Sequence, residues 1–261
     1  SVLHAAGGIC PFELGENTST TLGDHTVKLS NGRVPYSVQN VRRVPHNLFS
    51  RSRTKPSQIE LGLDPAYEIA ASKIRDEDLE GLDLRCWRLA FNGAEPVRAP
   101  TLERFASRFA RYGFDRRALM PVYGLAETSV ALTMSPLERP ARVDALVREP
   151  FERTREVRPT DATDPHALRF VSCGGPLPEH QIRVVDASGQ PLAERVEGHV
   201  QFRGPSVTSG YYRNSDATRA VMHDGWMDSG DLGYQADGEL FITGRVKDII
   251  SRGSLKVAPL E

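Results

Sequence analysis

Residues 123–128, Tyr-Gly-Leu-Ala-Glu-Thr, place a carboxylate and a hydroxyl directly after a glycine turn. The apolar residues at 119–122 predict a short strand before the turn, and the carboxyl end of such a strand is a common ligand position in α/β sheets. Glu127 can supply one hard oxygen to Mg²⁺, which takes few carboxylates beside waters and phosphates. Thr128 can donate to a phosphate oxygen. The same residue types also suit an ordinary turn and helix start, so both interpretations stay open for this motif alone.

Three shorter groups add candidate ligand contacts. Asp231, at the end of Ser-Gly-Asp, can accept hydrogen bonds from two vicinal hydroxyls such as those of a ribose. Arg245 follows a glycine at a predicted strand end, where its planar guanidinium can reach a ligand. The Asn-Gly-Ala-Glu-Pro sequence at 92–96 lets the backbone approach a flat ring closely. Taken singly, each group also fits a plain turn or a solvated strand end.

Composition narrows the class of protein. The chain has 261 residues with 39% hydrophobic content, which suits one large or two small globular domains. A net charge of -1 argues against nucleic acid as the main partner. No apolar run approaches the ~20 residues of a membrane span, and we expect no signal peptide at the first residues. The 3 cysteines have no metal-binding spacing, which favours free thiols in a cytoplasmic protein.

The chain changes character several times. Residues 1–63 have weak periodicity and are left unassigned. Residues 64–135 predict an α/β layer, with a helix that Asp64-Pro65 caps and opens, a strand at 87–91 and a helix that stops at Gly113. The charged, Pro-rich stretch 136–165 predicts a surface insertion. Residues 166–243 predict a small β-rich subdomain, with strands near 168–172, 181–185, 199–203 and 239–243 separated by turns at 188–189, 213–214, 223–225 and 237–238.

In their order and spacing, these groups resemble motifs of the adenylate-forming superfamily of acyl-CoA synthetases, luciferases and peptide-synthetase adenylation domains. A further match is Gly-His-Val-Gln-Phe-Arg-Gly-Pro at 198–205, followed by Ser-Gly-Tyr-Tyr at 209–212. The resemblance covers residues 66 to 250. It implies an α/β fold that is part of the large N-terminal adenylation domain, with the α/β layer followed by the β-rich subdomain.

The resemblance also implies roles and cofactors. It makes the protein an acyl-activating ligase that uses ATP and Mg²⁺, with Glu127 as the metal ligand and Glu127 and Thr128 as catalytic residues. Lys247 matches the hinge of the C-terminal lid, so 244–261 would be the hinge and the start of that lid. The residues implied to hold the nucleotide are Gly93, Ala94, Glu95, Pro96, Tyr123, Gly124, Asp231 and Arg245.

Within the superfamily, the fatty acyl-AMP ligases fit best. Val-Ser-Cys-Gly at 171–174, followed by Pro176, resembles their signature after a family-specific insertion. This implies a fatty acid substrate and an acyl-carrier protein as acceptor; the alternatives are an acyl-CoA synthetase, with CoA as acceptor, and a non-catalytic nucleotide-binding fragment. Cys173 is expected to be a small buried side chain and not a nucleophile.

Two catalytic parts of the family have no counterpart here. The phosphate loop ending in Pro-Lys-Gly is not recognisable before Asn92, and the C-terminal lid with its lysine would follow Glu261. We therefore expect an interior piece of a larger enzyme, truncated at the hinge, with little or no ATP–pyrophosphate exchange of its own. A shifted reading frame or a chimeric gene would explain residues 1–63; translation of the other frames tests that hypothesis.

Overall fold

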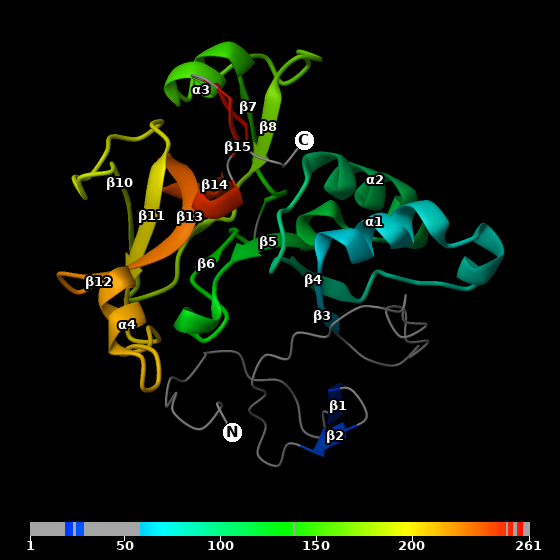
Figure 1. Ribbon diagram of the computed structural model, residues 1–261. Coiled ribbons are helices and arrows are strands. Elements are labelled where there is room, and N and C mark those ends of the chain that lie inside the picture. The colour runs from blue at the N-terminus through cyan, green and yellow to red at the C-terminus, as the bar shows by residue number, and fades with distance from the viewer. Residues whose placement is uncertain are drawn as a thin grey trace.

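The computed structural model describes residues 19–22, 25–28, 58–137, 139–248, 250–252 and 255–257 (Figure 1). The strands are β1 (Ser19–Leu22), β2 (His25–Lys28), β3 (Gln58–Gly62), β4 (Trp87–Asn92), β5 (Leu119–Tyr123), β6 (Thr133–Met134), β7 (Val143–Leu146), β8 (Leu168–Val171), β9 (Gly175–Pro176), β10 (Gln181–Val185), β11 (Gly198–Arg203), β12 (Met222–His223), β13 (Trp226–Ala236), β14 (Glu239–Arg245), β15 (Ile250–Arg252) and β16 (Leu255–Val257). The helices are α1 (Asp64–Lys73), α2 (Ala99–Phe109), α3 (Arg148–Thr154) and α4 (Ser215–Val221), with short 3-10 turns η1 (Asp76–Leu79), η2 (Ala110–Tyr112), η3 (Arg116–Ala118), η4 (Ala126–Thr128) and η5 (Val246–Asp248).

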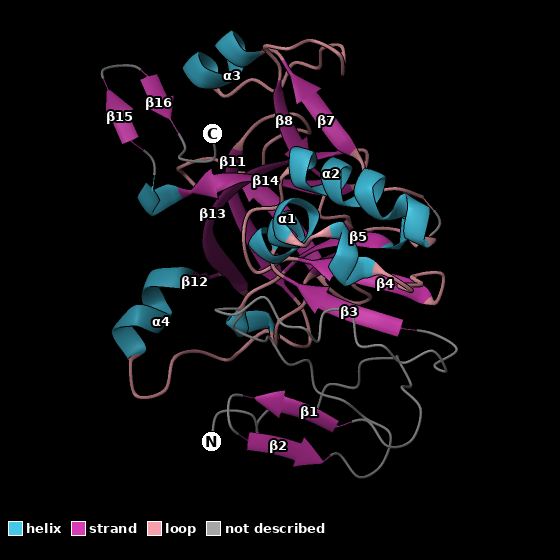
Figure 2. Cartoon of the chain, turned by 90° about the vertical axis from the view of Figure 1, so that its right-hand side faces the viewer, coloured by secondary structure: helices cyan, strands magenta, loops and turns pink. Residues whose placement is uncertain are grey.

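The first layer is a sheet in the order β3-β4-β5-β6-β9. Strands β3, β4 and β5 run parallel, while β6 and β9 join antiparallel. The connections between the parallel strands contain α1 and α2, which lie together over one face of the strands (Figure 2). This arrangement brings the carboxyl ends of β4 and β5 side by side, where the predicted ligand motifs begin.

An aromatic core joins the helices to the sheet. Phe105 of α2 is fully buried and packs edge-on against Tyr67 of α1, with ring centroids 4.9 Å apart. It also lies 6.4 Å from the ring of Trp87 on β4 and 5.1 Å from that of Phe114. The predicted helix stop is confirmed, since Gly113 adopts a left-handed φ of 83° after η2.

The second layer is an antiparallel sheet in the order β10-β11-β13-β12, with β14 also paired to β13. Two tight connections have the sequence Asp-Gly with positive φ at both residues, at 224–225 between β12 and β13 and at 237–238 between β13 and β14. Such two-residue turns match the twist of an antiparallel pair. The predicted turns at these places and the order of an α/β layer before a β-rich subdomain are therefore confirmed.

The stretch 136–165 contributes structure of its own. Strand β7 pairs antiparallel with β8, and α3 follows it. Leu146 and Phe151 are buried in a cluster with Tyr234 and Phe241 of the second sheet. The Asp144 carboxylate accepts hydrogen bonds from the Tyr234 hydroxyl at 2.9 Å and from Arg195 at 3.0 Å. The stretch is thus fixed to β13 and β14 by apolar and ionic contacts.

Several local expectations differ from the structure. Asp64 begins α1 but does not cap it. The N-cap is Leu63, whose apolar side chain makes no capping hydrogen bond. Ser229 to Asp231 do not form a separate turn; they lie inside the long strand β13, where Gly230 has a left-handed φ of 72°. Strand β3 lies before residue 64 and pairs with β4. Long-range pairing, which local patterns do not encode, decides these points.

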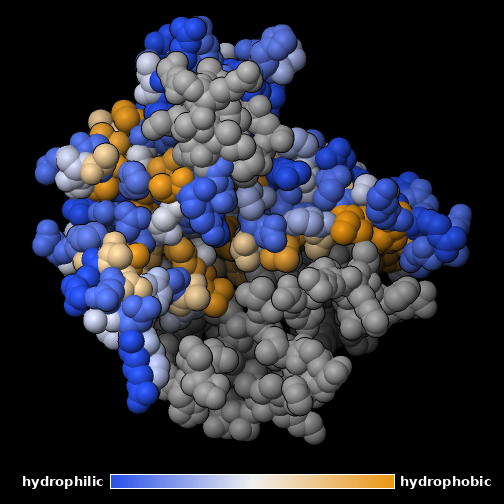
Figure 3. Space-filling model, in the orientation of Figure 1, coloured by the Kyte–Doolittle hydropathy of each residue, from blue (hydrophilic) through white to orange (hydrophobic). Residues whose placement is uncertain are grey.

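On the face shown in Figure 3, hydrophilic and hydrophobic side chains are interspersed. Among the residues that the structure describes, no helix is long and apolar enough to cross a membrane.

The buried aromatic core yields a stability prediction. Phe105→Ala should lower the free energy of unfolding by about 3–5 kcal/mol, because it removes buried apolar surface and leaves a cavity among the rings of Tyr67, Trp87, Phe109 and Phe114. Urea denaturation of the chain measures the change. Ser107→Ala, on the exposed side of the same helix, should change it by less than about 0.5 kcal/mol. Equal losses in the two variants would contradict this account of the core.

Candidate active site

The two sheets meet at the carboxylate of Asp231, which is 4% exposed. The hydroxyl of Tyr123, at the end of β5, donates to Asp231 Oδ2 at 2.7 Å. Arg245, at the end of β14, places Nε 3.2 Å from Oδ1 of the same carboxylate. Asp231 and Arg245 face each other in the β13–β14 register. The structure therefore brings together three of the side chains that the sequence indicated.

The surroundings of the Asp231 carboxylate act on its pKa in opposite directions. Burial raises the pKa of Asp231, while the Tyr123 hydroxyl and the Arg245 guanidinium pull it down. Burial and the adjacent Asp231 charge hold the pKa of Tyr123 well above its usual value, so the phenol stays a neutral donor. Each carboxylate oxygen has two lone pairs and uses one on these partners. The remaining lone pairs can accept hydrogen bonds from a ligand.

The loop at 93–96 follows the end of β4, next to β5. A Cβ on Gly93 would come within 2.7 Å of a Val122 methyl and 2.8 Å of the Val122 carbonyl oxygen, so only glycine fits there. Ala94 has a left-handed φ of 64°, and Ala94, Glu95 and Pro96 are exposed. Gly93 therefore allows β4 and β5 to approach closely, while the approach of this loop to a flat ring stays a prediction.

The turn after Tyr123 is tightly constrained. A Cβ on Gly124 would lie 2.0 Å from the Val130 carbonyl oxygen, which excludes any other residue without movement. Ser129 and Val130 have positive φ values of 55° and 88°. A β-branched residue in that region is strained, and such strain concentrates at functional sites. Sequence reasoning did not identify this feature, because φ follows from how the chain returns toward β6.

Glu127 and Thr128 lie in this turn, in different environments. The Glu127 side chain is half-buried, and its Oε1 accepts a hydrogen bond from the Tyr211 hydroxyl at 2.8 Å. The Thr128 side chain is 1% exposed, and its hydroxyl donates to the Leu125 carbonyl oxygen at 3.0 Å. A phosphate role for Thr128 would require this hydroxyl to leave Leu125, and that role stays a prediction.

The loop after β11 packs over the same turn. Thr208 N donates to the Glu127 carbonyl oxygen at 2.8 Å, and Ser206 Oγ donates to the Thr128 carbonyl oxygen at 2.9 Å. Tyr211 belongs to the motif at 209–212, and the sequence alone indicates no role for it. Its contact with Glu127 spans 84 residues of sequence, so only the fold could reveal it.

The structure also gives the positions of Lys247 and Cys173. Lys247 is exposed in η5, two residues beyond Arg245. Cys173 is buried, and burial raises the pKa of its thiol to about 12, as expected for a side chain that is not a nucleophile. Over the described ranges, no group of three or more His, Cys, Asp or Glu side chains could hold a metal ion. A cation at Glu127 would therefore take most of its ligands from a bound substrate and water.

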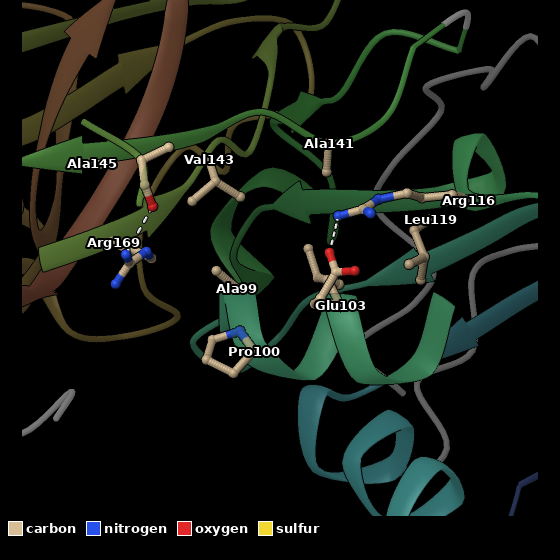
Figure 4. Close-up of a pocket in the computed structure, with 11 residues that line it drawn as sticks. Ala99, Pro100, Glu103, Arg116, Leu119, Ala141, Val143, Ala145 and Arg169 are labelled. Atoms are coloured by element: carbon tan, nitrogen blue, oxygen red, sulfur yellow. Dashed lines mark hydrogen bonds and ion pairs between the residues drawn. The ribbon is translucent and has the colours of Figure 1, made fainter. Parts of the chain in front are cut away.

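A cavity of about 480 Å³ lies between α2 and the β7–β8 pair (Figure 4). Its lining includes Leu119, Val143 and Arg169, and the side chains of Glu103 and Arg116 form an ion pair at its wall. None of the candidate nucleotide residues lines it. This space is therefore separate from the Asp231 cluster.

Comparison with known proteins identifies relatives. The family model described as AMP-binding enzyme matches residues 41–212, so the match begins inside the stretch that the sequence left unassigned. A putative acyl-CoA synthetase of Caulobacter vibrioides is 38% identical over 74% of this chain and 34% of its own length. A medium-chain-fatty-acid–[acyl-carrier-protein] ligase of Moorena producens is 37% identical over 77% of this chain and 35% of its own length.

Solved structures agree. A structure from studies of fatty acyl-adenylate ligases from E. coli and L. pneumophila has a TM-score of 0.73 and 38% identity, over 77% of this chain and 36% of that chain. An adenylation domain of a keto acid-selecting peptide-synthetase module has a TM-score of 0.65 and 28% identity, over 76% of this chain and 36% of that chain. The chain spans about a third of the length of the curated relatives it matches. The expected fold class, part of an adenylation domain, is confirmed.

The Asp231 cluster yields a prediction about proton binding. Arg245→Met should raise the pKa of Asp231 further, because it removes the cation that favours the ionised carboxylate. Tyr123→Phe should shift it in the same direction, since it removes a hydrogen bond to that carboxylate. Carbon-detected NMR titration of the Asp231 carboxyl measures both. Lys247→Met, which removes a nearby exposed charge, should leave the pKa much closer to the wild-type value. A lower or unchanged pKa in the Arg245 variant would rule out the proposed pairing.

Proposed function

The chain belongs to the family of AMP-binding enzymes, and from that premise we propose that it forms the nucleotide-binding part of a fatty acyl-AMP ligase. The observation that carries this proposal is the buried Asp231 carboxylate, held by Tyr123 and Arg245 at the meeting of the two sheets. The relatives named as fatty-acid ligases and the fatty acyl-adenylate ligase structures support the substrate class.

In this proposal, the cluster binds a ribose. Asp231 accepts hydrogen bonds from the two vicinal hydroxyls through its remaining lone pairs. Arg245 and Tyr123 hold the carboxylate in place before the nucleotide arrives, so that less ordering is needed on binding. Adenine lies against a surface formed by Gly93, Ala94, Glu95 and Pro96. Gly124 lets the backbone of the turn at Val130 approach the end of β5.

The reaction we propose has two halves. The carboxylate of a fatty acid attacks the α-phosphorus of ATP, which gives acyl-AMP and pyrophosphate. The sulfur of an acceptor thiol then attacks the acyl carbon and forms a thioester, as AMP leaves and the thiol proton passes to solvent. Asp231 and Arg245 orient the nucleotide for in-line attack and take no covalent part. Thr128, if its hydroxyl leaves Leu125, donates to a phosphoryl oxygen as charge grows there.

Mg²⁺ fits this site as a cation with one protein carboxylate. Glu127 would hold it with one oxygen while Tyr211 donates to the other, Oε1. When bound, the ion neutralises charge on the phosphate oxygens. We also propose Lys247 as the hinge position of a C-terminal lid and residues 136–165 as the family-specific insertion. We also propose a cytoplasmic location, because the 3 cysteines of the sequence have no metal-binding spacing and fit a reducing compartment.

The proposed acceptor is an acyl-carrier protein. The carrier-protein ligase of Moorena producens supports this choice, while the putative acyl-CoA synthetase of Caulobacter vibrioides, at similar identity, favours CoA as the second candidate.

Loss of the ribose contact should weaken nucleotide binding. Asp231→Ala should raise the dissociation constant for a stable acyl-adenylate analogue by roughly 10–100-fold, the equivalent of losing a charge-assisted hydrogen-bond pair. Isothermal titration measures the affinity. Asp216→Ala, at an exposed aspartate of α4, is the matched control and should bind as the wild type does. An unchanged affinity in the Asp231 variant would contradict the assignment of Asp231 to the ribose.

Analysis of the reaction products distinguishes an acyl-carrier protein from CoA as the acceptor of the acyl group. The test uses a full-length ligase that carries this region, supplied with ATP, Mg²⁺ and a medium-chain fatty acid. The ligase should load phosphopantetheinylated carrier protein at least about tenfold faster than it forms acyl-CoA. We expect this difference because an enzyme discriminates between acceptors by contacts made in the transition state more than by ground-state binding. Mass spectrometry of both products measures the ratio. Preferential acyl-CoA formation would establish the second candidate instead.

A further inference from the structure

A second buried carboxylate, that of Asp64, lies beneath the loop that follows β4. Asp64 is 4% exposed and is the first residue of α1. It has no part in the ribose cluster, and although the charge of Arg98 lowers its pKa, no ion pair holds it among the described residues. Its partners are instead backbone and side-chain donors from the loop at 92–98 and from α2.

These contacts grip both ends of that loop. Asn92, the last residue of β4, donates from Nδ2 to Asp64 Oδ1 at 3.1 Å. The backbone N–H of Arg98 donates to the same oxygen at 3.1 Å. Between these two anchors lie Gly93 to Pro96, the proposed adenine surface. A single carboxylate oxygen therefore fixes the entry and the exit of the loop.

The carboxylate also replaces a helix cap. Arg98 is the N-cap of α2, and its own side chain makes no capping hydrogen bond. Asp64 accepts its N–H from another element, and the Thr101 hydroxyl in the first turn of α2 lies 3.0 Å from Asp64 Oδ2. The start of α2, and with it the end of the loop, is thus set by a residue 34 positions away from Arg98.

The Thr101 hydroxyl lies between two carboxylates. Its Oγ1 is 3.0 Å from Asp64 Oδ2 and 3.2 Å from Glu68 Oε2, and a hydroxyl has one proton to donate. Burial raises the pKa of Asp64, while the hydrogen bonds from the Arg98 N–H, Asn92 and Thr101 lower it. Asparagine at position 64 would keep an oxygen that accepts from Asn92 and Arg98, and its amide nitrogen would donate to Thr101, which would then donate to Glu68.

Asn92 shows that this arrangement is costly to the chain. Its side chain is fully buried, and its Oδ1 is a buried atom without a hydrogen-bond partner within the described part of the protein. A buried unpaired carbonyl oxygen is unfavourable, so the other atoms of the Asn92 side chain must compensate for it. The Nδ2 amide does so by donating to Asp64.

We propose that Asp64 is a positioning residue that pre-orders the adenine-binding loop by anchoring Asn92 and Arg98 at its two ends. This inference rests on the proposed nucleotide function. Asp64 does not touch the nucleotide; it acts by holding Gly93 to Pro96 in the conformation that adenine meets, which reduces the ordering needed on binding.

The experiment combines AMP titration with hydrogen exchange of the nucleotide-free chain. Asp64→Ala should raise the AMP dissociation constant roughly tenfold, since loop ordering then has to accompany binding, and should speed exchange of the 93–98 amides, above all that of Arg98. Asp64→Asn should keep both within about twofold of the wild type, because its amide oxygen still accepts from Asn92 and Arg98 at the two ends of the loop.

Tyr67→Phe is the matched control for a general loss of stability. The Tyr67 hydroxyl donates to the Phe91 carbonyl oxygen at 2.8 Å, so this variant also removes a buried hydrogen bond between α1 and β4 but leaves both loop anchors in place. It should lower the midpoint of thermal unfolding without changing AMP affinity. If Asp64→Ala does not fold, Asn92→Ala removes one anchor and should weaken AMP binding about threefold, since half of the constraint remains.

The outcomes separate the two proposals. A wild-type chain that binds no AMP overturns the proposed function. A wild-type chain that binds AMP, with an Asp64→Ala variant equal to it in affinity or in exchange at 93–98, overturns only the role of Asp64. Failure of Asp64→Asn to retain the wild-type affinity, or a loss in Tyr67→Phe as large as in Asp64→Ala, also overturns that role.

Discussion

The hydrogen bond from Tyr123 to Asp231 is the contact on which the rest of the site depends. It joins residues 108 positions apart, one at the end of a parallel strand and the other within the antiparallel sheet. A carboxylate buried to this degree is unfavourable unless donors surround it, and Tyr123 and Arg245 supply them from two different strands. The two layers must therefore be held in one relative position for this group to be tolerated at all.

The remainder of the fold provides that position. Gly93 and Gly124 allow β4, β5 and the following turn to approach more closely than any side chain would permit. On the far side of the β-rich layer, Asp144 binds Tyr234 and Arg195, while Leu146 and Phe151 pack against Phe241. These contacts brace β13 and β14, the strands that carry Asp231 and Arg245. Both faces of the cluster are thus supported by side chains outside it.

A good part of this could be predicted from the sequence. The strand at 181–185 and the Asp-Gly turns at 224–225 and 237–238 depend on local residue types, and the structure has them where the patterns indicated. Strand β13 was not predicted, because Ser229 and Gly230 interrupt its pattern and only pairing with β11 and β14 makes it a strand. The buried parts of 136–165 were also missed, since Leu146 and Phe151 are isolated among charged residues and find their partners in another sheet.

The sequence by itself determined which residue types could bind a nucleotide and in what order they occur, because motifs such as 92–96 and 123–128 are short runs of neighbouring residues. It also determined the succession of an α/β layer and a β-rich subdomain, since periodicity and turn residues act over a few positions. Only the tertiary structure decided that Tyr123, Asp231 and Arg245 share one buried carboxylate, that Tyr211 reaches Glu127, and that Asp64 binds Asn92 and Arg98 rather than capping its own helix. The reason is physical: a buried polar group takes whichever donors the packed chain brings within about 3 Å, and those donors lie tens of residues away in sequence.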